Sequence, residues 1–323
     1  GVDVINNTGK TPTKISTGMN TTIVLMTDGS IYGCGYNGYG EIGDGTTTSR
    51  TSLTQLINNT GKIAQDVFFG GRHMIVLMTD GTVYGCGSNI TGQLGDGTTT
   101  NRTSIVQMIN NTGRTIAKII VEDYNTMLLM TDGLIYGCGN NYFGQLGNGH
   151  NSNRTTLTLL TNNTGKTPKD ITMGISSTYV LMTDNSLYSC GYNNYSQLGD
   201  GTTTNRNTID EFQNNTGKIP DSMTTGYAFI LILMTDGSVY GCGYNGWGQF
   251  ANGTTTSTNV LIEIQNNTGE IASLISSGYD HSIIMMKDQL VYGSGKNSSG
   301  QLGNGYDGEW RTTLVKINHA KPI

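Results

Sequence analysis

The segment Leu25-Met26-Thr27-Asp28-Gly29 returns almost unchanged along the chain. Copies begin at residues 77, 129, 181 and 233, and a weaker copy covers residues 285–289. The aspartates that anchor the copies are 52 residues apart at every step: Asp28, Asp80, Asp132, Asp184, Asp236 and Asp288. Self-similarity at a fixed period is the signature of a repeat architecture. The fold is therefore explained by one 52-residue unit used six times.

Each repeat contains four short β-prone runs separated by turns. In the first copy the runs 22–26 and 30–34 flank Asp28-Gly29, and such a pair predicts a type I′ hairpin turn. A glycine-dense loop at 38–45 leads to a third strand at 52–57, and the run 63–69 forms a fourth strand before the next hairpin. Asn185 fits the glycine position of the turn because Asn tolerates the left-handed region. Gln289 fits it less well, so we expect the sixth hairpin to be the least regular.

Four short strands per repeat, without helical periodicity, predict an all-β fold, a β-propeller of four-stranded blades. Residues 1–323 form a single closed propeller domain in this interpretation, and six blades are favoured. Val4-Ile5-Asn6 matches Lys316-Ile317-Asn318 six repeats later, so both ends offer the same closing strand. The surplus strand is left over, completes a truncated extra blade, or pairs with another molecule, since unpaired edge strands invite pairing.

The charge of the chain argues against nucleic acid as a partner. Lys and Arg number 18 against 23 Asp and Glu, and no basic cluster stands out. Proteins that grip phosphates normally carry a basic face. No apolar run approaches the roughly 20 residues that span a bilayer, so we expect no membrane span. The chain begins at Gly1, which suggests a processed or trimmed product.

The repeats also resemble a known family. The pattern Asp-Gly-x-Val/Ile-Tyr-x-x-Gly-x-Asn-x-x-Gly-Gln-Leu-Gly covers Asp80 to Gly95 and Asp132 to Gly147, with looser copies elsewhere. It is similar to the repeat of the regulator of chromosome condensation (RCC1-like) family. The resemblance implies a propeller, and the family's usual seven blades are the alternative to six. One departure is that cysteine, or Ser294 in the last copy, stands where the family usually has Trp.

Five cysteines share one repeat position: Cys34, Cys86, Cys138, Cys190 and Cys242. A metal ring or disulfides would be one interpretation, but small buried filler is favoured. Equivalent positions on neighbouring blades are too far apart for disulfides, which need Cα atoms within about 7 Å, and the spacing is unlike a zinc motif. His73 and His281 share another position, where we expect them to tie a turn. With no nucleophile, phosphate or dinucleotide motif, we expect no enzyme, no cofactor and no metal.

The chain also contains many Asn-x-Thr/Ser sequons, the acceptor sites for N-glycans. Abundant Asn and Thr explain the Asn-x-Thr/Ser sequons without any function, and we favour that explanation. N-glycans are the alternative if the chain meets a glycosylation machinery. The sequons begin at Asn6, Asn20, Asn58, Asn89, Asn101, Asn110, Asn153, Asn162, Asn194, Asn214, Asn252, Asn266 and Asn297.

Two sets of positions are candidates for partner binding. The stretch before each hairpin differs most between copies, and in a propeller these loops gather on one face. The Gly-x-Asn loops add aromatic residues, and Tyr and Trp are common interface anchors. Covering the blade edges is an equally good explanation for the aromatic set. The predicted partner-binding residues are Arg72, His73, Glu122, Asp123, Tyr124, Tyr179, Tyr227, Phe229, Tyr279, Asp280, His281, Tyr39, Phe143, Tyr195 and Trp247.

A constant frame with variable loops, and no catalytic constellation, predicts a non-enzymatic module for protein binding or self-assembly. The Asn/Thr-rich, charge-poor copies resemble repeat proteins of AT-rich genomes such as giant DNA viruses. A virion structural or fibre component follows from that likeness, with the virion or host cytoplasm favoured over an extracellular location. The family resemblance implies an alternative, a guanine-nucleotide exchange factor for a small GTPase.

Overall fold

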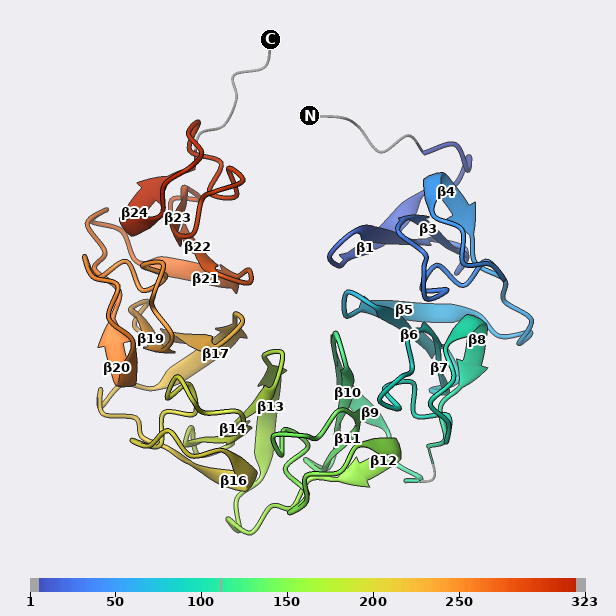
Figure 1. Cartoon of the computed structure of the whole chain (residues 1–323), viewed down its shortest axis with the longest axis horizontal. Helices are drawn as coiled ribbons and strands as arrows, with labels where there is room; N and C mark the ends of the chain where they lie inside the picture. Colours follow the sequence, from blue (N-terminus) through green and yellow to red (C-terminus); the bar gives the residue numbers. More distant parts are fainter. Residues whose placement is uncertain (1–5, 111, 318–323) are drawn as a thin grey trace. The chain divides into compact units, whose positions relative to one another are not determined.

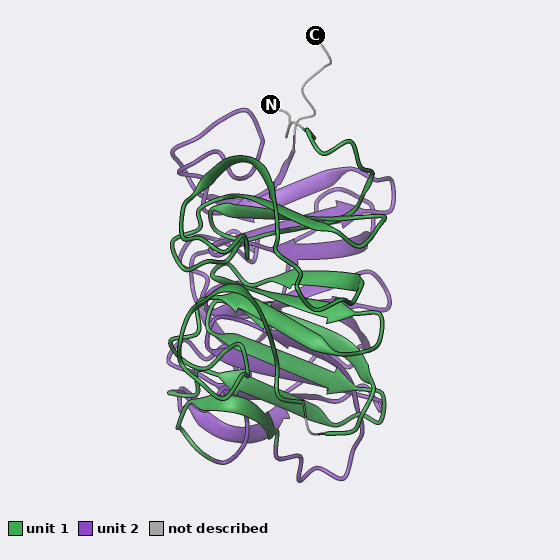
Figure 2. Cartoon of the chain, turned by 90° about the vertical axis from the view of Figure 1, so that its right-hand side faces the viewer, with its two compact units in different colours: residues 1–142, 150–160 green, residues 143–149, 161–323 purple. Residues whose placement is uncertain are grey.

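The computed structural model describes residues 6–110 and 112–317, and every regular element in this part of the chain is a β-strand. The chain divides into two compact units, residues 1–142 with 150–160 and residues 143–149 with 161–323 (Figure 2). Unit 1 holds β1 (Pro12–Thr17), β2 (Thr21–Met26), β3 (Ile31–Gly35), β4 (Arg50–Gln55), β5 (Ala64–Phe69), β6 (His73–Met78), β7 (Val83–Gly87), β8 (Arg102–Gln107), β9 (Ile116–Glu122), β10 (Asn125–Met130), β11 (Ile135–Gly139) and β12 (Arg154–Leu159). Unit 2 holds β13 (Pro168–Met173), β14 (Ser177–Met182), β15 (Leu187–Gly191), β16 (Arg206–Phe212), β17 (Pro220–Thr225), β18 (Phe229–Met234), β19 (Val239–Gly243), β20 (Thr258–Glu263), β21 (Ala272–Ser277), β22 (His281–Met286), β23 (Val291–Gly295) and β24 (Arg311–Lys316).

The strands form six four-stranded antiparallel sheets, each built from four consecutive strands in the order of the sequence (Figure 1). These sheets, blades 1 to 6, confirm the predicted propeller blades. The fourth predicted strand of each repeat opens the sheet of the next blade, as β5 does for blade 2. The predicted closing strands lie at residues 4–6 and 316–318, of which residues 4, 5 and 318 are outside the described residues.

The inner hairpin differs from the predicted type I′ turn. The loop holds four residues, Thr27 to Ser30, and the Gly29 N–H donates to Met26 O at 3.0 Å. Only Gly29, with φ of 79°, is left-handed in this loop. The Asp28 carboxylate accepts the Ser30 N–H at 3.0 Å and so caps a longer turn in place of the tight one.

The sixth hairpin is as regular as the others, so that prediction is wrong. Gln289 adopts φ of 67° in the glycine position, and its N–H donates to Met286 O at 3.0 Å. Asn185 adopts φ of 68°, as predicted. The sheet thus imposes the left-handed conformation even on a residue that disfavours it.

The C-terminal strand departs from the 52-residue step by one residue. In blade 1, Tyr32 pairs with Gln55, whereas in blade 6 Tyr292 pairs with Lys316, one residue later in the repeat. The loop before β24 holds the extra residue. The predicted match of Lys316-Ile317 with the N-terminal strand is therefore out of register by one, while residues 4, 5 and 318 lie outside the described part.

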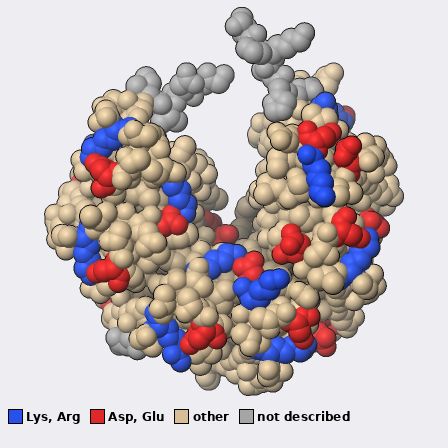
Figure 3. All heavy atoms as spheres, turned by 180° about the vertical axis from the view of Figure 1, so that it is seen from behind, with Lys and Arg blue, Asp and Glu red and all other residues tan. Residues whose placement is uncertain are grey.

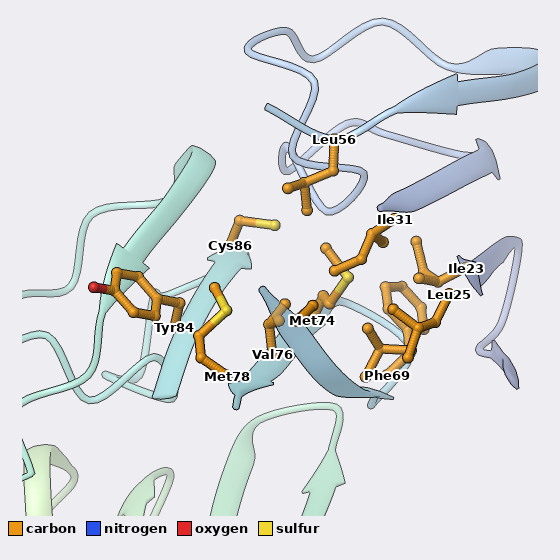
Figure 4. Close-up of a cluster of buried hydrophobic side chains, with 12 residues drawn as sticks. Ile23, Leu25, Ile31, Leu56, Phe69, Met74, Val76, Met78, Tyr84 and Cys86 are labelled. Carbon is orange, nitrogen blue, oxygen red and sulfur yellow. The ribbon is translucent and has the colours of Figure 1, made fainter. Parts of the chain in front are cut away.

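The core lies in the joints between neighbouring blades. Ile23, Leu25, Ile31 and Leu56 of blade 1 pack in one buried cluster with blade 2 residues such as Phe69 and Met74 (Figure 4). Blades 2 and 3 share a similar cluster, as do blades 4 and 5 and blades 5 and 6. These four pairs of blades therefore bury their facing apolar sides by stacking, as expected for repeat proteins. A smaller buried cluster of Val24, Met26, Tyr32 and Leu53 lies within blade 1.

The shared cysteine position also ties blades together. The Cys86 thiol donates to Glu41 O of the preceding blade at 3.6 Å, and the Cys138 thiol donates to Gln93 O at 3.4 Å. Ser294 makes the same contact to Gln249 O at 3.0 Å. Burial raises the pKa of Cys138 to about 12, so this thiol stays protonated and available as a donor.

Candidate functional site

The candidate site lies on the loops that join the first and second strands of each blade. We call these the inner loops, residues 18–20, 70–72, 123–124, 174–176, 226–228 and 278–280. We call the connections between the third and fourth strands the long loops. Glycine permits the close approach of neighbouring inner loops: a Cβ on Gly70 would lie 2.8 Å from the backbone of Glu122. Within each unit, the inner loops of successive blades therefore lie side by side.

Arg72 is the centre of the surface in unit 1. Its guanidinium lies over two aromatic rings, 5.1 Å from the centroid of Tyr124 and 5.8 Å from that of Tyr39. One nitrogen donates to the Tyr39 hydroxyl at 3.2 Å, and Nε lies 3.8 Å from Asp123 Oδ2. These contacts link the inner loops of blades 2 and 3 with the long loop of blade 1. We call Tyr39, Arg72, Asp123 and Tyr124 the Arg72 cluster.

Two acids lie near this arginine, half-buried Asp123 and buried Glu41, and half-buried Glu122 neighbours Asp123. Burial, with the neighbouring Asp123 charge, raises the pKa of Glu122 to about 8. Burial also raises the pKa of Asp123, although the Arg72 charge opposes that change. Glu41 is fully buried below the loop, and its Oε2 accepts the Tyr39 N–H at 2.8 Å. The cluster therefore offers one delocalised cation held between aromatic rings, with carboxyl groups behind it.

A surface pocket of about 180 Å³ opens beside the cluster. Met19, Asn20, Tyr36, Tyr39, Gly71 and Arg72 line it, so it lies between blades 1 and 2. The exposed Met19 and Tyr36 give it apolar walls, and the arginine gives it a charged one.

Unit 2 presents a second, mainly aromatic surface. Tyr227 and Tyr279, on adjacent inner loops, stack with ring centroids 4.6 Å apart and an interplanar angle of 17°. The Tyr227 N–H donates to Tyr279 O at 2.9 Å, which fixes the two loops together. The side chains remain 38% and 51% exposed, so the stacked pair is accessible to a partner. Such pairs are stabilising beyond their buried area.

The long loops of unit 2 extend this surface. Phe143 lies 4.7 Å from Tyr192 between ring centroids, Tyr192 lies 6.1 Å from Tyr195, and Tyr195 lies 5.0 Å from Tyr244. Four rings from three successive long loops therefore form a continuous row. Tyr195 is the exposed member of the row, and Phe143 is half-buried.

The edge of the aromatic surface carries one ion pair. Trp247 and Trp310 meet edge to face with ring centroids 5.7 Å apart, and the Lys296 ammonium lies 5.0 Å from the Trp247 ring. The same ammonium lies 3.4 Å from Asp280 Oδ2. Half-burial lowers the pKa of His281, so this neighbouring imidazole is neutral near pH 7.

Four of the predicted binding residues are buried: Asp280, at the edge of the aromatic surface, and three others that are not part of either surface. His73 lies beneath its inner loop with Nε2 2.9 Å from Thr126 Oγ1, and burial lowers its pKa to about 3. Tyr179 donates its hydroxyl to Gln197 O at 3.0 Å inside the joint of blades 4 and 5. Phe229 packs below Gly226 in the next joint. All three support the loops from inside.

Sequence reasoning missed Lys296, Trp310 and Glu41 as parts of these surfaces. Lys296 occupies the repeat position of Tyr36, Tyr192 and Tyr244. A charged residue at a position that is tyrosine in three other repeats could have marked it as a candidate. Trp310 lies in the loop that holds the extra residue before β24, so the repeat pattern contained no signal for it.

Other charges form local pairs. At the hairpins, Lys62 lies 2.8 Å from Asp80, and Lys10 lies 2.8 Å from Asp28. Figure 3 shows Lys and Arg beside Asp and Glu on the drawn face of the described chain. Among the described residues, no three His, Cys, Asp or Glu side chains gather as a metal site. No helix that could cross a membrane is present in residues 6–110 and 112–317.

The Asn-Asn-Thr-Gly sequons lie in turns that use the asparagine side chain. The Asn58 amide donates to Lys62 O at 2.8 Å, and its oxygen accepts the Thr60 hydroxyl at 2.6 Å. Asn89 and Asn297 are buried. Glycosylation of the chain stays a prediction.

Comparison with known proteins places these blades in a repeat class. Two profiles described as the Regulator of chromosome condensation (RCC1) repeat match the chain, one at residues 28–77, 80–128, 132–181 and 236–285 and the other at 13–41, 64–93, 169–197 and 272–301. The first alone covers more than half of the chain. The protein belongs to the RCC1 repeat family.

Similar curated proteins include the ultraviolet-B receptor UVR8 of Arabidopsis thaliana and the E3 ubiquitin-protein ligase HERC2 of Homo sapiens. The plant receptor is 23% identical over 90% of this chain, and the chain spans 66% of its length. The human ligase is 25% identical over 91% of this chain, which spans only 6% of that protein.

Solved structures show the same fold. Human WBSCR16 matches with a TM-score of 0.83 and 19% identity, over 96% of this chain and 82% of the other. Yeast RCC1 (Prp20), solved with Kap60, matches with a TM-score of 0.82 and 16% identity, over 95% of this chain and 75% of the other. At such identities the likeness shows the fold alone.

Proposed function

We propose that this chain is a protein-binding module and that its inner and long loops are the binding surface. The observation that carries the proposal is the accessible Tyr227–Tyr279 stack, held by a backbone hydrogen bond on adjacent rigid blades. Tyr, Trp and Arg dominate the energetics of protein interfaces, and loops on a rigid scaffold are the usual carriers of binding.

The Arg72 cluster gives unit 1 a comparable anchor. The guanidinium is held between the rings of Tyr39 and Tyr124, so little side-chain entropy remains to be lost when a partner binds. An ordered arginine presents its donors to carboxylates or carbonyls in a fixed geometry. A partner for this surface would place acceptors at the arginine and apolar groups in the pocket between blades 1 and 2.

Proteins of similar fold also bind proteins. Yeast RCC1 was solved bound to Kap60, and Prp20p was studied for its binding to Gsp1p and histones. The guanine-nucleotide exchange factor alternative stays a prediction for this chain, as do the virion role and the expectation that it is not an enzyme. Nucleotide release measured across a panel of small GTPases would test the exchange alternative.

The binding proposal is tested by affinity capture with matched variants. We compare the wild-type chain with Tyr279→Ala and Arg72→Ala, and with Ile219→Ala as the control. Ile219 is as exposed as Tyr279, at 51%, but it precedes β17 at the opposite end of the blade from the inner loops. We expect a protein that is retained by the wild type and the control but lost with a loop variant. Partners held equally by all four chains would contradict the proposal.

A further inference from the structure

A surface pocket of about 330 Å³ lies within unit 2, between the long loop of blade 4 and the start of β20 in blade 5. Two short segments line it: Asn194, Tyr195 and Ser196 of the first, and Ser257, Thr258 and Asn259 of the second. Its volume lies in the range of about 300–1,000 Å³ that is typical of small-molecule sites. The lining is one aromatic ring with five neutral polar side chains, and none of the six residues carries a charge.

Ser196 departs from the repeat at a point where neighbouring blades come close together. The other five repeats have glycine at this position. A Cβ on Gly40 would lie 2.7 Å from Thr103 Cα of the next blade, and a Cβ on Gly248 would lie 2.8 Å from Arg311 O. Ser196 carries a Cβ here and adopts the left-handed conformation, with φ of 62°. The long loop of blade 4 therefore cannot approach blade 5 as closely as the equivalent loops approach their neighbours.

The hydrogen bonds across this joint agree with a wider separation. In four other joints a glycine N–H of the long loop donates to the fourth strand of the next blade, as Gly45 does to Thr103 O at 2.8 Å. Among the described residues, the equivalent bond from the Gly201 N–H to Asn259 O is not formed. The Asn259 side-chain amide donates to Gly201 O at 3.3 Å and joins the two segments. The pocket thus lies where the other joints are closed by backbone contact.

Thr258 removes charge and bulk from the same place. The strand β20 begins with Thr258, whereas β4, β8, β12, β16 and β24 all begin with arginine. In blades 1, 2 and 4 this arginine pairs with an aspartate of its own long loop, as Arg102 does with Asp96 at 2.7 Å. Blade 5 has Asn252 at the aspartate position. Both charges of the ion pair are therefore replaced by neutral side chains beside the pocket.

This lining has the chemistry that recognises a sugar ring. Hydroxyl and amide side chains both donate and accept hydrogen bonds, as sugar hydroxyls do. Ser257 Oγ accepts the Asn245 N–H at 3.1 Å, which leaves its proton available to a ligand. The C–H face of a pyranose packs on an aromatic ring. Tyr195 offers such a ring, since it is 39% exposed and is supported by Tyr244 with ring centroids 5.0 Å apart.

We propose that this pocket binds a neutral pyranose sugar, either free or at the end of a glycan. An anionic ligand would need the arginine that blade 5 lacks, and an apolar ligand would leave the hydroxyl and amide groups of the lining unpaired. The site goes beyond protein binding by the loops and does not depend on it. Tyr195 is shared with the aromatic row, but the other five lining residues are not part of that row.

The proposal is tested by saturation-transfer NMR on the full chain. The probes are the methyl α- and β-pyranosides of glucose, galactose, mannose and N-acetylglucosamine, with glucose 6-phosphate as the charged comparison. We expect transfer to the ring protons of at least one neutral probe at millimolar concentration. Tighter binding of an oligosaccharide that ends in this sugar identifies a glycan end as the ligand, and equal binding identifies the free sugar. Transfer to none of the neutral probes, or to the phosphorylated probe alone, would overturn the proposal.

Variants of the lining locate the binding. Asn252→Asp combined with Thr258→Arg restores the ion pair of blades 1, 2 and 4, so this chain should fold and lose the sugar signal. Tyr195→Ala should weaken binding about tenfold, whereas Tyr195→Phe keeps the ring and should retain most of it. Tyr306→Ala, at a 71% exposed tyrosine of another long loop, is the control. Tyr279→Ala should leave sugar binding unchanged even where it abolishes capture of a protein. A double variant that binds sugar as well as wild type, or an equal loss with Tyr306→Ala, would refute the assignment.

Discussion

Replacing Gln289 with glycine should stabilise the chain. Gln289 adopts φ of 67° at a position where four other repeats have glycine. A side chain in the left-handed region costs about 1–2 kcal/mol. Part of this gain is lost, because glycine has greater freedom in the unfolded state and this lowers stability by about 0.4–1 kcal/mol. The net effect on the free energy of unfolding is therefore a gain of about 0.5–1 kcal/mol, measured by urea denaturation.

Two further variants show whether backbone strain is the cause. Asn185→Gly should change the unfolding free energy little, because asparagine tolerates its φ of 68°. Gly237→Gln should destabilise by more than 1 kcal/mol, since it adds strain and a Cβ there would lie 2.7 Å from Ile271 Cβ. A Gln289→Gly variant that is less stable than wild type, or a gain of equal size from Asn185→Gly, would refute the reasoning.

Three other predictions concern the joints and the half-buried Glu122. Cys138→Ser keeps a donor to Gln93 O, so it should change the free energy of unfolding by less than about 0.5 kcal/mol. Cys138→Ala removes this hydrogen bond and should lower the free energy of unfolding by about 1 kcal/mol, measured by urea denaturation. Val67→Ala should lower the free energy of unfolding by about 2 kcal/mol, because Val67 is fully buried in the joint of blades 1 and 2. Ile15→Ala should lower it by less than about 0.5 kcal/mol, because Ile15 is 63% exposed. Burial raises the pKa of Glu122 to about 8, so the folded state holds a proton that the unfolded state has already lost. Stability should therefore fall as pH rises from about 5 to about 8, and Glu122→Gln should flatten that slope in thermal melts; an unchanged slope would contradict the assignment.

The repeat made most of the fold predictable. A 52-residue step with β-prone runs defined the strands to within two residues, as for β4 and β5. The cysteine position was interpretable because a small residue repeated at one place implies a confined space. The one-residue slip before β24 was hidden, because the glycine-rich loop there carries no register signal of its own.

The candidate site was less predictable because burial depends on neighbouring blades. Tyr179 and Phe229 lie close to variable loops in sequence, but strands β14 and β18 are buried on both faces, so these side chains point into joints. The Asp-Gly pair alone predicted a two-residue turn. The structure has a four-residue loop instead, because the Asp28 carboxylate caps it by accepting the Ser30 N–H. Arg72 was found as a variable position, but its stacking on Tyr39 and Tyr124 required the neighbouring blades.

Photo-cross-linking would test most directly whether the loops are the binding surface. A photoreactive phenylalanine analogue at Tyr279 or Tyr39 should form covalent adducts with a bound protein, and the same analogue at Ile219 should form none. Adducts that arise equally at Ile219, or at Ile219 alone, would contradict a binding surface built from the inner and long loops.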